Sequence, residues 1–193
     1  MHWQRESLKK LINLMIYDDI EYNNIIKNNG LFVRRNCFSI SDRDQLTSLL
    51  KSIDYEPIYY NKKISRYEAD INIKNEAVSK IVVSMKSLAQ EIGYRNINME
   101  IYAFKYLASN QVPWHRDTKR HKMIAIAYFG EFTGGEYVYQ DENGDIAEIN
   151  INKGDLLISI NRTECGKYIN PYHKVNEIKS GCRYCLAISI INK

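Results

Sequence analysis

Residues 96–129 read NINMEIYAFKYLASNQVPWHRDTKRHKMIAIAYF, and this stretch decides which fold the sequence predicts. From Met99 to Leu107 two sets of side chains alternate, which is typical of a β-strand because successive strand residues point to opposite faces. Residues 123–129 form a second apolar run of strand length. The pattern therefore becomes strand-like at about Asn96, and the second half of the chain indicates β-structure.

The rest of that half supplies further short strands separated by turn signals. Residues 137–139 and 147–149 flank Asn143-Gly144, a dipeptide that favours a tight hairpin turn. The remaining runs are residues 156–160, 172–175 and 183–191. A set of about seven or eight short strands after a helical lead-in predicts an α+β fold, namely an antiparallel jelly roll or barrel with N-terminal helices packed on one sheet.

The first half of the chain is expected to be mainly helical. Apolar residues recur at helical spacing over 7–26 and over 75–92. Ser41 is predicted to be the N-cap of a helix that ends near Ser52. The buried side of that helix would carry Leu46, Leu49 and Leu50. No linker or repeat divides the sequence, so we expect a single domain over 1–193, with a helical lead-in over 1–95 and a jelly-roll core over 96–193.

Composition points to a soluble protein. The chain is 45% hydrophobic and 26% charged, and its formal net charge of +4 lacks the dense basic stripe that is typical of nucleic-acid binding. The first residues do not have the layout of a secretion signal, and no stretch approaches the ~18 apolar residues of a membrane span. We therefore expect a cytoplasmic protein with reduced thiols and no membrane partner. The cysteines are Cys37, Cys165, Cys182 and Cys185.

The motif His115-Arg116-Asp117 is the strongest candidate for a chemical site. Residues i and i+2 of a strand point to the same face, so His115 and Asp117 can reach one metal ion. His173 lies 56 residues after Asp117 on another predicted strand and could supply a third ligand. Two imidazoles and one carboxylate leave coordination positions open for dioxygen and a chelating co-substrate on iron(II). A zinc hydrolase would accept the same trio.

Arg183 lies ten residues after His173, at the start of the last apolar strand. An arginine on an interior strand face is costly unless it meets a carboxylate, and a bidentate pair is what a dicarboxylate co-substrate offers. The alternative is a solvent-facing hairpin residue that follows Ser180-Gly181.

Together these motifs resemble the 2-oxoglutarate/iron(II)-dependent dioxygenase superfamily, and within it the prolyl-hydroxylase-like branch. The resemblance covers about residues 96–193. It rests on His115-x-Asp117, Gly134-Gly135-Glu136, Lys153-Gly154-Asp155-Leu156-Leu157, His173 and Arg183. It implies a double-stranded β-helix with iron(II), 2-oxoglutarate and dioxygen, and with ascorbate as a supporting reductant. It also implies metal ligands His115, Asp117 and His173, with Arg183, Tyr128 and Tyr106 at the co-substrate.

The implied reaction is hydroxylation of an unactivated C–H bond, with release of succinate and carbon dioxide. Asp117 favours hydroxylation, because related halogenases have a small residue in place of that carboxylate. The nucleic-acid demethylases carry a second arginine where this chain has Ser189, which makes a nucleic-acid substrate a weaker hypothesis. The expected substrate is an amino acid, a peptide residue or a small metabolite. A cupin-like metal-binding or sensory protein without turnover is the alternative from another class.

Two aromatic residues are candidates for the substrate pocket, Trp114 and Tyr102, although both also suit an aromatic core. His121, in the basic segment Lys119-Arg120-His121-Lys122, is expected to be a solvated loop residue. The same segment would attract an acidic substrate if it bordered the pocket.

Overall fold

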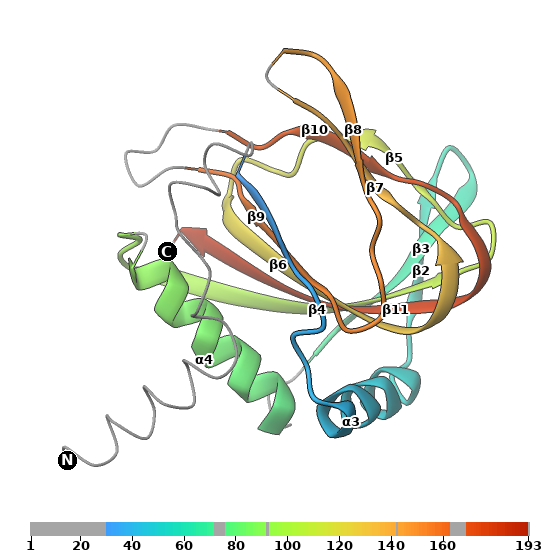
Figure 1. The fold of residues 1–193 in the computed structure, drawn as a ribbon, viewed down its shortest axis with the longest axis horizontal. Coiled ribbons are helices and arrows are strands. Elements are labelled where there is room, and N and C mark those ends of the chain that lie inside the picture. Colours follow the sequence, from blue (N-terminus) through green and yellow to red (C-terminus); the bar gives the residue numbers. More distant parts are fainter. Residues whose placement is uncertain (1–29, 72–75, 92, 142, 163–168, 193) are drawn as a thin grey trace.

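The computed structural model describes residues 30–71, 76–91, 93–141, 143–162 and 169–192. Figure 1 shows a strongly curved sheet with a smaller sheet above it and two helices below it. The elements in chain order are β1 (Leu31–Arg34), α3 (Ile40–Lys51), β2 (Glu56–Tyr60), β3 (Lys63–Asp70), α4 (Glu76–Glu91), β4 (Ile97–Leu107), β5 (Val112–His115), β6 (His121–Gly134), β7 (Tyr137–Gln140), β8 (Ile146–Ile149), β9 (Leu156–Ile160), β10 (Tyr172–Val175) and β11 (Ile178–Asn192).

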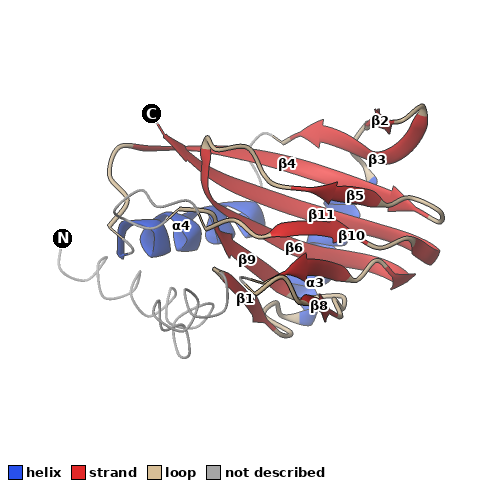
Figure 2. Cartoon of the chain, turned by 90° about the horizontal axis from the view of Figure 1, so that it is seen from above, coloured by secondary structure: helices blue, strands red, loops and turns tan. Residues whose placement is uncertain are grey.

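The strands form two sheets. The major sheet has seven strands in the order β1-β9-β6-β11-β4-β3-β2, and the minor sheet has four in the order β5-β10-β7-β8. Every strand pair in both sheets is antiparallel. Figure 2 shows the minor sheet lying over the major sheet. The predicted antiparallel β-fold is therefore confirmed, and Asn143-Gly144 does lie between the paired strands β7 and β8.

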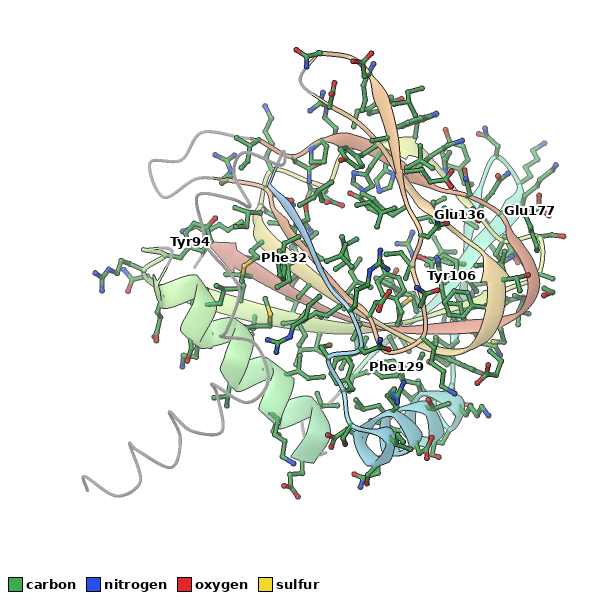
Figure 3. All side chains as sticks on the ribbon, viewed as in Figure 1. Phe32, Tyr94, Tyr106, Phe129, Glu136 and Glu177 are labelled. Atoms are coloured by element: carbon green, nitrogen blue, oxygen red, sulfur yellow. The ribbon has the colours of Figure 1, made fainter. Side chains whose placement is uncertain are left out.

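The two faces of the major sheet have different surroundings. Leu186, Ile188 and Ile190 of β11 join a hydrophobic core with the helices, whereas Cys185 belongs to a second core between the two sheets. Neighbouring β6 shows the same alternation. Figure 3 places Phe129 of β6 toward the helices and Tyr106 of β4 in the space between the sheets. The inner face of the major sheet is therefore the floor of the barrel.

Both helices pack on the outer face of the major sheet. Leu46 and Leu50 of α3 and Met85 of α4 are buried in the same core as the outer residues of β6 and β11. The N-cap of α3 is Ser39, not Ser41: the Ser39 Oγ accepts a hydrogen bond from the Asp42 N–H at 3.1 Å. No helix in the described part of the chain is long and apolar enough to cross a membrane.

The first half contains more β-structure than the sequence predicted. Strands β1, β2 and β3 all join the major sheet, where a mainly helical lead-in was expected. Strands β1 and β2 have only four and five residues, which is too short for a clear period. The turn between β2 and β3 uses Asn61 and Lys62 in the left-handed region (φ +47° and +64°) rather than a glycine signal. The helix predicted over 7–26 lies outside the described residues.

Replacing Met85 with Ala should lower the free energy of unfolding by about 2–5 kcal/mol, because its fully buried side chain fills the contact between α4 and the major sheet. The matched control is Val83→Ala on the same helix, where the side chain is 41% exposed and the expected change is within about 0.5 kcal/mol. Urea denaturation followed by circular dichroism measures both. Equal losses in the two variants would show that α4 does not dock through Met85.

Candidate metal centre and the buried arginine pocket

The two histidines come together because β5 and β10 pair in the minor sheet, with His115 and His173 as direct cross-strand partners. In each ring Nδ1 lies near the carbonyl oxygen two residues earlier, at 2.9 Å from Pro113 and 3.0 Å from Pro171. A carbonyl can only accept, so Nδ1 carries the proton and donates it. In this tautomer the Nε2 atom of each ring is the one that can bind a metal ion.

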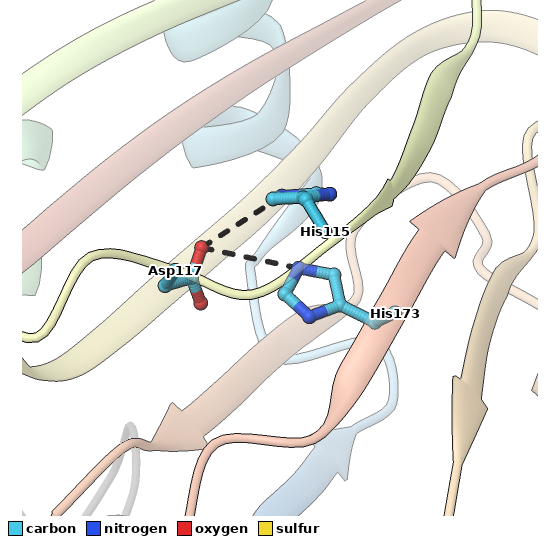
Figure 4. Close-up of side chains that lie close together, drawn as sticks. All are labelled: His115, Asp117 and His173. Atoms are coloured by element: carbon cyan, nitrogen blue, oxygen red, sulfur yellow. Dashed lines mark ion pairs between the residues drawn. The ribbon is translucent and has the colours of Figure 1, made fainter.

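Asp117 follows the end of β5 and completes the trio. Its Oδ1 lies 3.9 Å from the Nε2 of His115 and 3.9 Å from the Nε2 of His173, as Figure 4 shows. Its Oδ2 accepts a hydrogen bond from the Asn170 side-chain amide at 2.8 Å and a longer one from Asn161 at 3.4 Å. The amides hold one carboxylate oxygen, so the other is turned toward the histidines.

Asn161 and Asn170 are buried, and sequence reasoning missed both. They are also bonded to each other, because the Asn170 amide donates to Asn161 Oδ1 at 2.6 Å. The Asn170 Oδ1 accepts from the main-chain N–H of Asp117 at 3.2 Å. Asn170 lies just three residues before the ligand His173, but no pattern in the sequence distinguishes it from a turn residue.

The ligand atoms of His115, Asp117 and His173 all lie within 4.8 Å of one another. Burial lowers the pKa of His173, and the nearby Asp117 carboxylate only partly opposes this. The ring is therefore neutral at ordinary pH, as coordination requires. Two imidazole nitrogens and one carboxylate oxygen suit iron(II) with open positions, and they suit zinc equally well. The trio alone does not select the metal.

Arg183 is 1% exposed and lies on the inner face of β11. Its Nη1 donates to the Gly135 carbonyl oxygen at 2.6 Å, and its Cζ lies 4.3 Å from the Tyr106 ring centre and 5.5 Å from that of Tyr128. Its Nε has no hydrogen-bond partner among the described residues. No carboxylate of the described residues forms an ion pair with it. A buried cation in this state calls for an anionic ligand.

Gly135 has to be a glycine for the arginine to sit there. Its φ is +74°, and a Cβ at this position would lie 2.6 Å from Nη1 of Arg183 and 2.4 Å from Cδ1 of Ile178. The Gly134-Gly135 motif therefore makes room for the guanidinium. The Gly154-Asp155 motif is a turn instead: buried Asp155 accepts hydrogen bonds from the Asn152 N–H at 2.8 Å and from Arg35 Nη1 at 2.5 Å.

The metal ligands and Arg183 line one cavity of about 260 Å³ between the sheets. Tyr106, Tyr128 and Tyr137 line it as well, and burial raises the pKa of each of these phenols. All three therefore stay neutral and can donate an O–H hydrogen bond. The cavity thus places three neutral phenols and one guanidinium around a space that opens onto the metal ligands.

The opposite end of the cavity is polar. Tyr102 donates its O–H to Glu100 Oε2 at 2.7 Å, and Arg120 forms an ion pair with the same carboxylate. His121 was expected to be a solvated loop residue, but it begins β6, lines the cavity and contacts the Ser189 hydroxyl through Nδ1. Burial lowers the pKa of His121. A β-bulge where β6 pairs with Ile191 of β11 accompanies this inward position.

Trp114 does not line the cavity, in contrast to the expectation from the sequence. Its indole ring stacks on the Tyr172 ring at 5.1 Å, on the outer face of the minor sheet. Trp114 directly precedes the inward-facing His115, so strand alternation turns it to the opposite face. The bulge, in which Pro113 and Trp114 oppose the single residue Lys174, lets Val112 line the cavity as well. Tyr102, the other substrate-pocket candidate, does line the cavity.

No protein-family model matches this sequence, and no curated protein sequence matches it. Solved structures do match its fold. A Pseudomonas putida prolyl-4-hydroxylase has a TM-score of 0.70 at 15% identity, over 89% of this chain and 97% of its own. An oxidoreductase of the 2OG-Fe(II) oxygenase family from Burkholderia pseudomallei has a TM-score of 0.68 at 12% identity, over 88% and 89%.

A third match is a prolyl hydroxylase from Trichoplax adhaerens, solved in complex with a peptide fragment of the hypoxia inducible factor oxygen degradation domain. It has a TM-score of 0.69 at 15% identity, over 100% of this chain and 94% of its own. At such identities the likeness establishes the fold. The chain has the fold of the 2-oxoglutarate/iron(II) oxygenases, as the sequence resemblance predicted.

Replacing His173 with Ala should abolish iron(II) binding, because two ligands remain of three. Asn170→Ala should weaken binding by about 10- to 100-fold, because it removes the shorter of the two amide hydrogen bonds to the Asp117 carboxylate without removing a ligand. Asn176→Ala, directly after the end of β10, is the control and should bind as the parent does, because that side chain contacts the exposed Glu148 and does not line the cavity. Anaerobic titration against a chelator measures all three. Parent-like affinity in His173→Ala would contradict the assignment.

Proposed function

We propose that this protein is an iron(II)- and 2-oxoglutarate-dependent oxygenase that hydroxylates an unactivated C–H bond of an amino acid, a peptide residue or a small metabolite. One observation carries the proposal: a buried arginine, which no carboxylate in the described part of the chain pairs with, lines the same cavity as a two-histidine, one-carboxylate trio. A zinc hydrolase or a non-catalytic metal-binding protein would use the trio, but neither accounts for Arg183. Likeness of fold to known oxygenases supports the same choice.

In this function, His115, Asp117 and His173 hold iron(II). When bound together, iron and 2-oxoglutarate supply the activation of dioxygen that releases succinate and carbon dioxide. The protein's other residues position these three ligands. The Pro113 and Pro171 carbonyls fix the two imidazole tautomers, and the buried amide of Asn170 fixes the carboxylate of Asp117.

Arg183 binds the distal carboxylate of 2-oxoglutarate. Its buried Nε donates to none of the residues that the structure describes, and the Gly135 carbonyl holds Nη1. Tyr128 and Tyr106 flank the guanidinium and remain protonated, so either can donate to a carboxylate oxygen. In a desolvated cavity this combination selects a dicarboxylate over water.

The polar end of the cavity is the candidate substrate side. Tyr102 and His121 offer hydrogen bonds there, and the cation of Arg120 is balanced by Glu100. This end is therefore polar without being strongly positive, which fits an amino acid or a peptide side chain better than a polyanion. Ser189, where a nucleic-acid demethylase would have an arginine, contacts His121 instead. The Trichoplax neighbour binds a peptide, and a peptide substrate is one of the classes proposed here.

Replacing Arg183 with Leu should leave iron binding nearly intact and weaken 2-oxoglutarate binding by at least about tenfold, because hydrogen bonds to charged groups contribute ~1.5–3 kcal/mol each. Arg183→Lys should be intermediate, since the point charge remains and the planar fork is lost. Anaerobic titration of 2-oxoglutarate into the iron-loaded protein, followed by the metal-to-ligand charge-transfer band, measures both. Unchanged co-substrate affinity in Arg183→Leu would mean that another residue is the anchor.

A turnover screen against amino acids, peptides and nucleosides should detect succinate release that depends on one substrate class. Asp117→Ala should lose this activity, because the carboxylate that balances the iron(II) charge is gone. Tyr59→Phe, which removes a hydroxyl from a side chain that is 61% exposed on β2 and outside the cavity lining, is the control and should retain it. Iron-loaded protein that binds 2-oxoglutarate but releases no succinate with any substrate would favour the sensory alternative.

A further inference from the structure

The outer face of the minor sheet carries a four-layer stack behind the metal ligands. The rings of Trp114 and Tyr172 stack at 5.1 Å with an angle of 17° between their planes. Lys174 Nζ lies 5.5 Å from the Trp114 ring centre, and Arg116 Cζ lies 5.9 Å from the Tyr172 ring centre. Each aromatic ring therefore contacts the other ring and one cation. We call these four residues the outer stack.

Members of the outer stack alternate with the metal ligands along the chain. Trp114 and Arg116 flank His115, and Tyr172 and Lys174 flank His173. Because strand neighbours point to opposite faces, the inward ligands and the outward stack share the same stretch of backbone. Two layers come from the β5 segment and two from β10, so the stack links the two segments that must stay in register.

The backbone ladder at this point is short. Strands β5 and β10 have four residues each, and the register shifts between His173 and Val175. Pro113 lies in the bulged stretch and has no N–H to donate to β10. The hydrogen-bonded ladder therefore fixes the cross-strand pair His115–His173 weakly. Aromatic and cation–π contacts across strands are the side-chain interactions that stabilise such a pair.

The outer stack also reaches the third ligand. Arg116, over the Tyr172 ring, donates from Nη1 to the main-chain carbonyl of Asn170 at 2.6 Å. The side-chain amide of the same Asn170 holds Asp117 Oδ2. If the Tyr172 ring were removed, Arg116 would lose its cation–π contact. Its hydrogen bond to the Asn170 main chain would then be less well fixed, and Asn170 in turn positions Asp117.

From this geometry we infer that Trp114, Tyr172, Lys174 and Arg116 are positioning residues for the metal centre: the outer stack holds β5 and β10 in the register that brings His115, His173 and Asp117 together. None of the four touches the metal position or lines the cavity. The inference rests on the proposed iron(II) function, because it concerns the same three ligands. Trp114 thus has a role outside the substrate pocket for which the sequence had suggested it.

The test uses the full chain and iron(II) added without oxygen. Trp114→Ala and Tyr172→Ala should each weaken iron(II) binding by about tenfold, the low end for residues that orient metal ligands. Trp114→Phe should restore most of the affinity, because a phenyl ring still stacks on Tyr172. Ile146→Ala is the matched control: its side chain is 69% exposed and its position pairs with Gln140, which in turn pairs with Tyr172 on the same face.

A merely structural role is distinguished by measuring the metal-free melting temperature alongside the iron(II) affinity. Tyr172 is 38% exposed, so its replacement leaves the core intact and keeps the test valid if Trp114→Ala folds poorly. Positioning predicts a smaller rise in melting temperature on iron addition in both alanine variants, because ligand stabilisation depends on affinity. Lower metal-free stability with parent-like iron affinity would overturn the inference. Parent-like affinity in His173→Ala as well would overturn the proposed function with it.

Discussion

Strand β11 imposes the constraint on which the rest of the structure depends. It has a hydrogen-bonded partner on each edge, β4 and β6, and its two faces meet opposite environments. Leu186, Ile188 and Ile190 enter the core between the major sheet and the helices, while Arg183 and Cys185 face the cavity. A slip of one residue would bury a guanidinium among aliphatic side chains and turn the core residues into the cavity. Both the packing and the chemistry therefore specify the same register.

Much of this could be read from the sequence, because the deciding features are periodic. The alternation from Met99 to Leu107 and the apolar run after it identify β4 and β6. Because successive strand residues point to opposite faces, the same pattern shows which residues face inward and which face outward. Alternation alone left Arg183 open to a solvent-facing hairpin position, and it was the combination with the His-x-Asp motif and His173 that predicted a carboxylate anchor; the structure buries it on the inner face. The spacing of His115, Asp117 and His173 needs only two neighbouring strands to become a cluster, and strands β5 and β10 provide them.

Other features could not be predicted, since they depend on tertiary contacts that leave no local period. Asn170 acts through its position beside Asp117, which the pairing of β10 with β5 creates. Trp114 is a different case: it directly precedes the inward-facing His115, so strand alternation already turns it outward, and the substrate-pocket prediction did not apply that rule. The short strands β1 and β2 acquire their partners only at the edges of a sheet that the second half builds.

The two halves of the candidate site are anchored with unequal rigidity. Arg183 sits on the longest strand, which is paired along both edges, so its position follows from the major sheet. The candidate ligands His115 and His173 face each other across the bulged pair β5–β10, and Asp117 lies beyond the end of β5. Strand β10 is also paired with β7, but β5 has only this short ladder, which does not by itself fix three donor atoms to a metal's tolerance. Additional contacts have to supply what the ladder lacks. On the inner side, the buried amide of Asn170 holds the Asp117 carboxylate. On the solvent side, we infer that the outer stack holds the two strands together. The cations of the stack remain close to water there, so they do not incur the desolvation cost of a buried charge. If the proposed roles hold, the co-substrate anchor is fixed by the major sheet, whereas the geometry at the metal depends on residues that do not touch it.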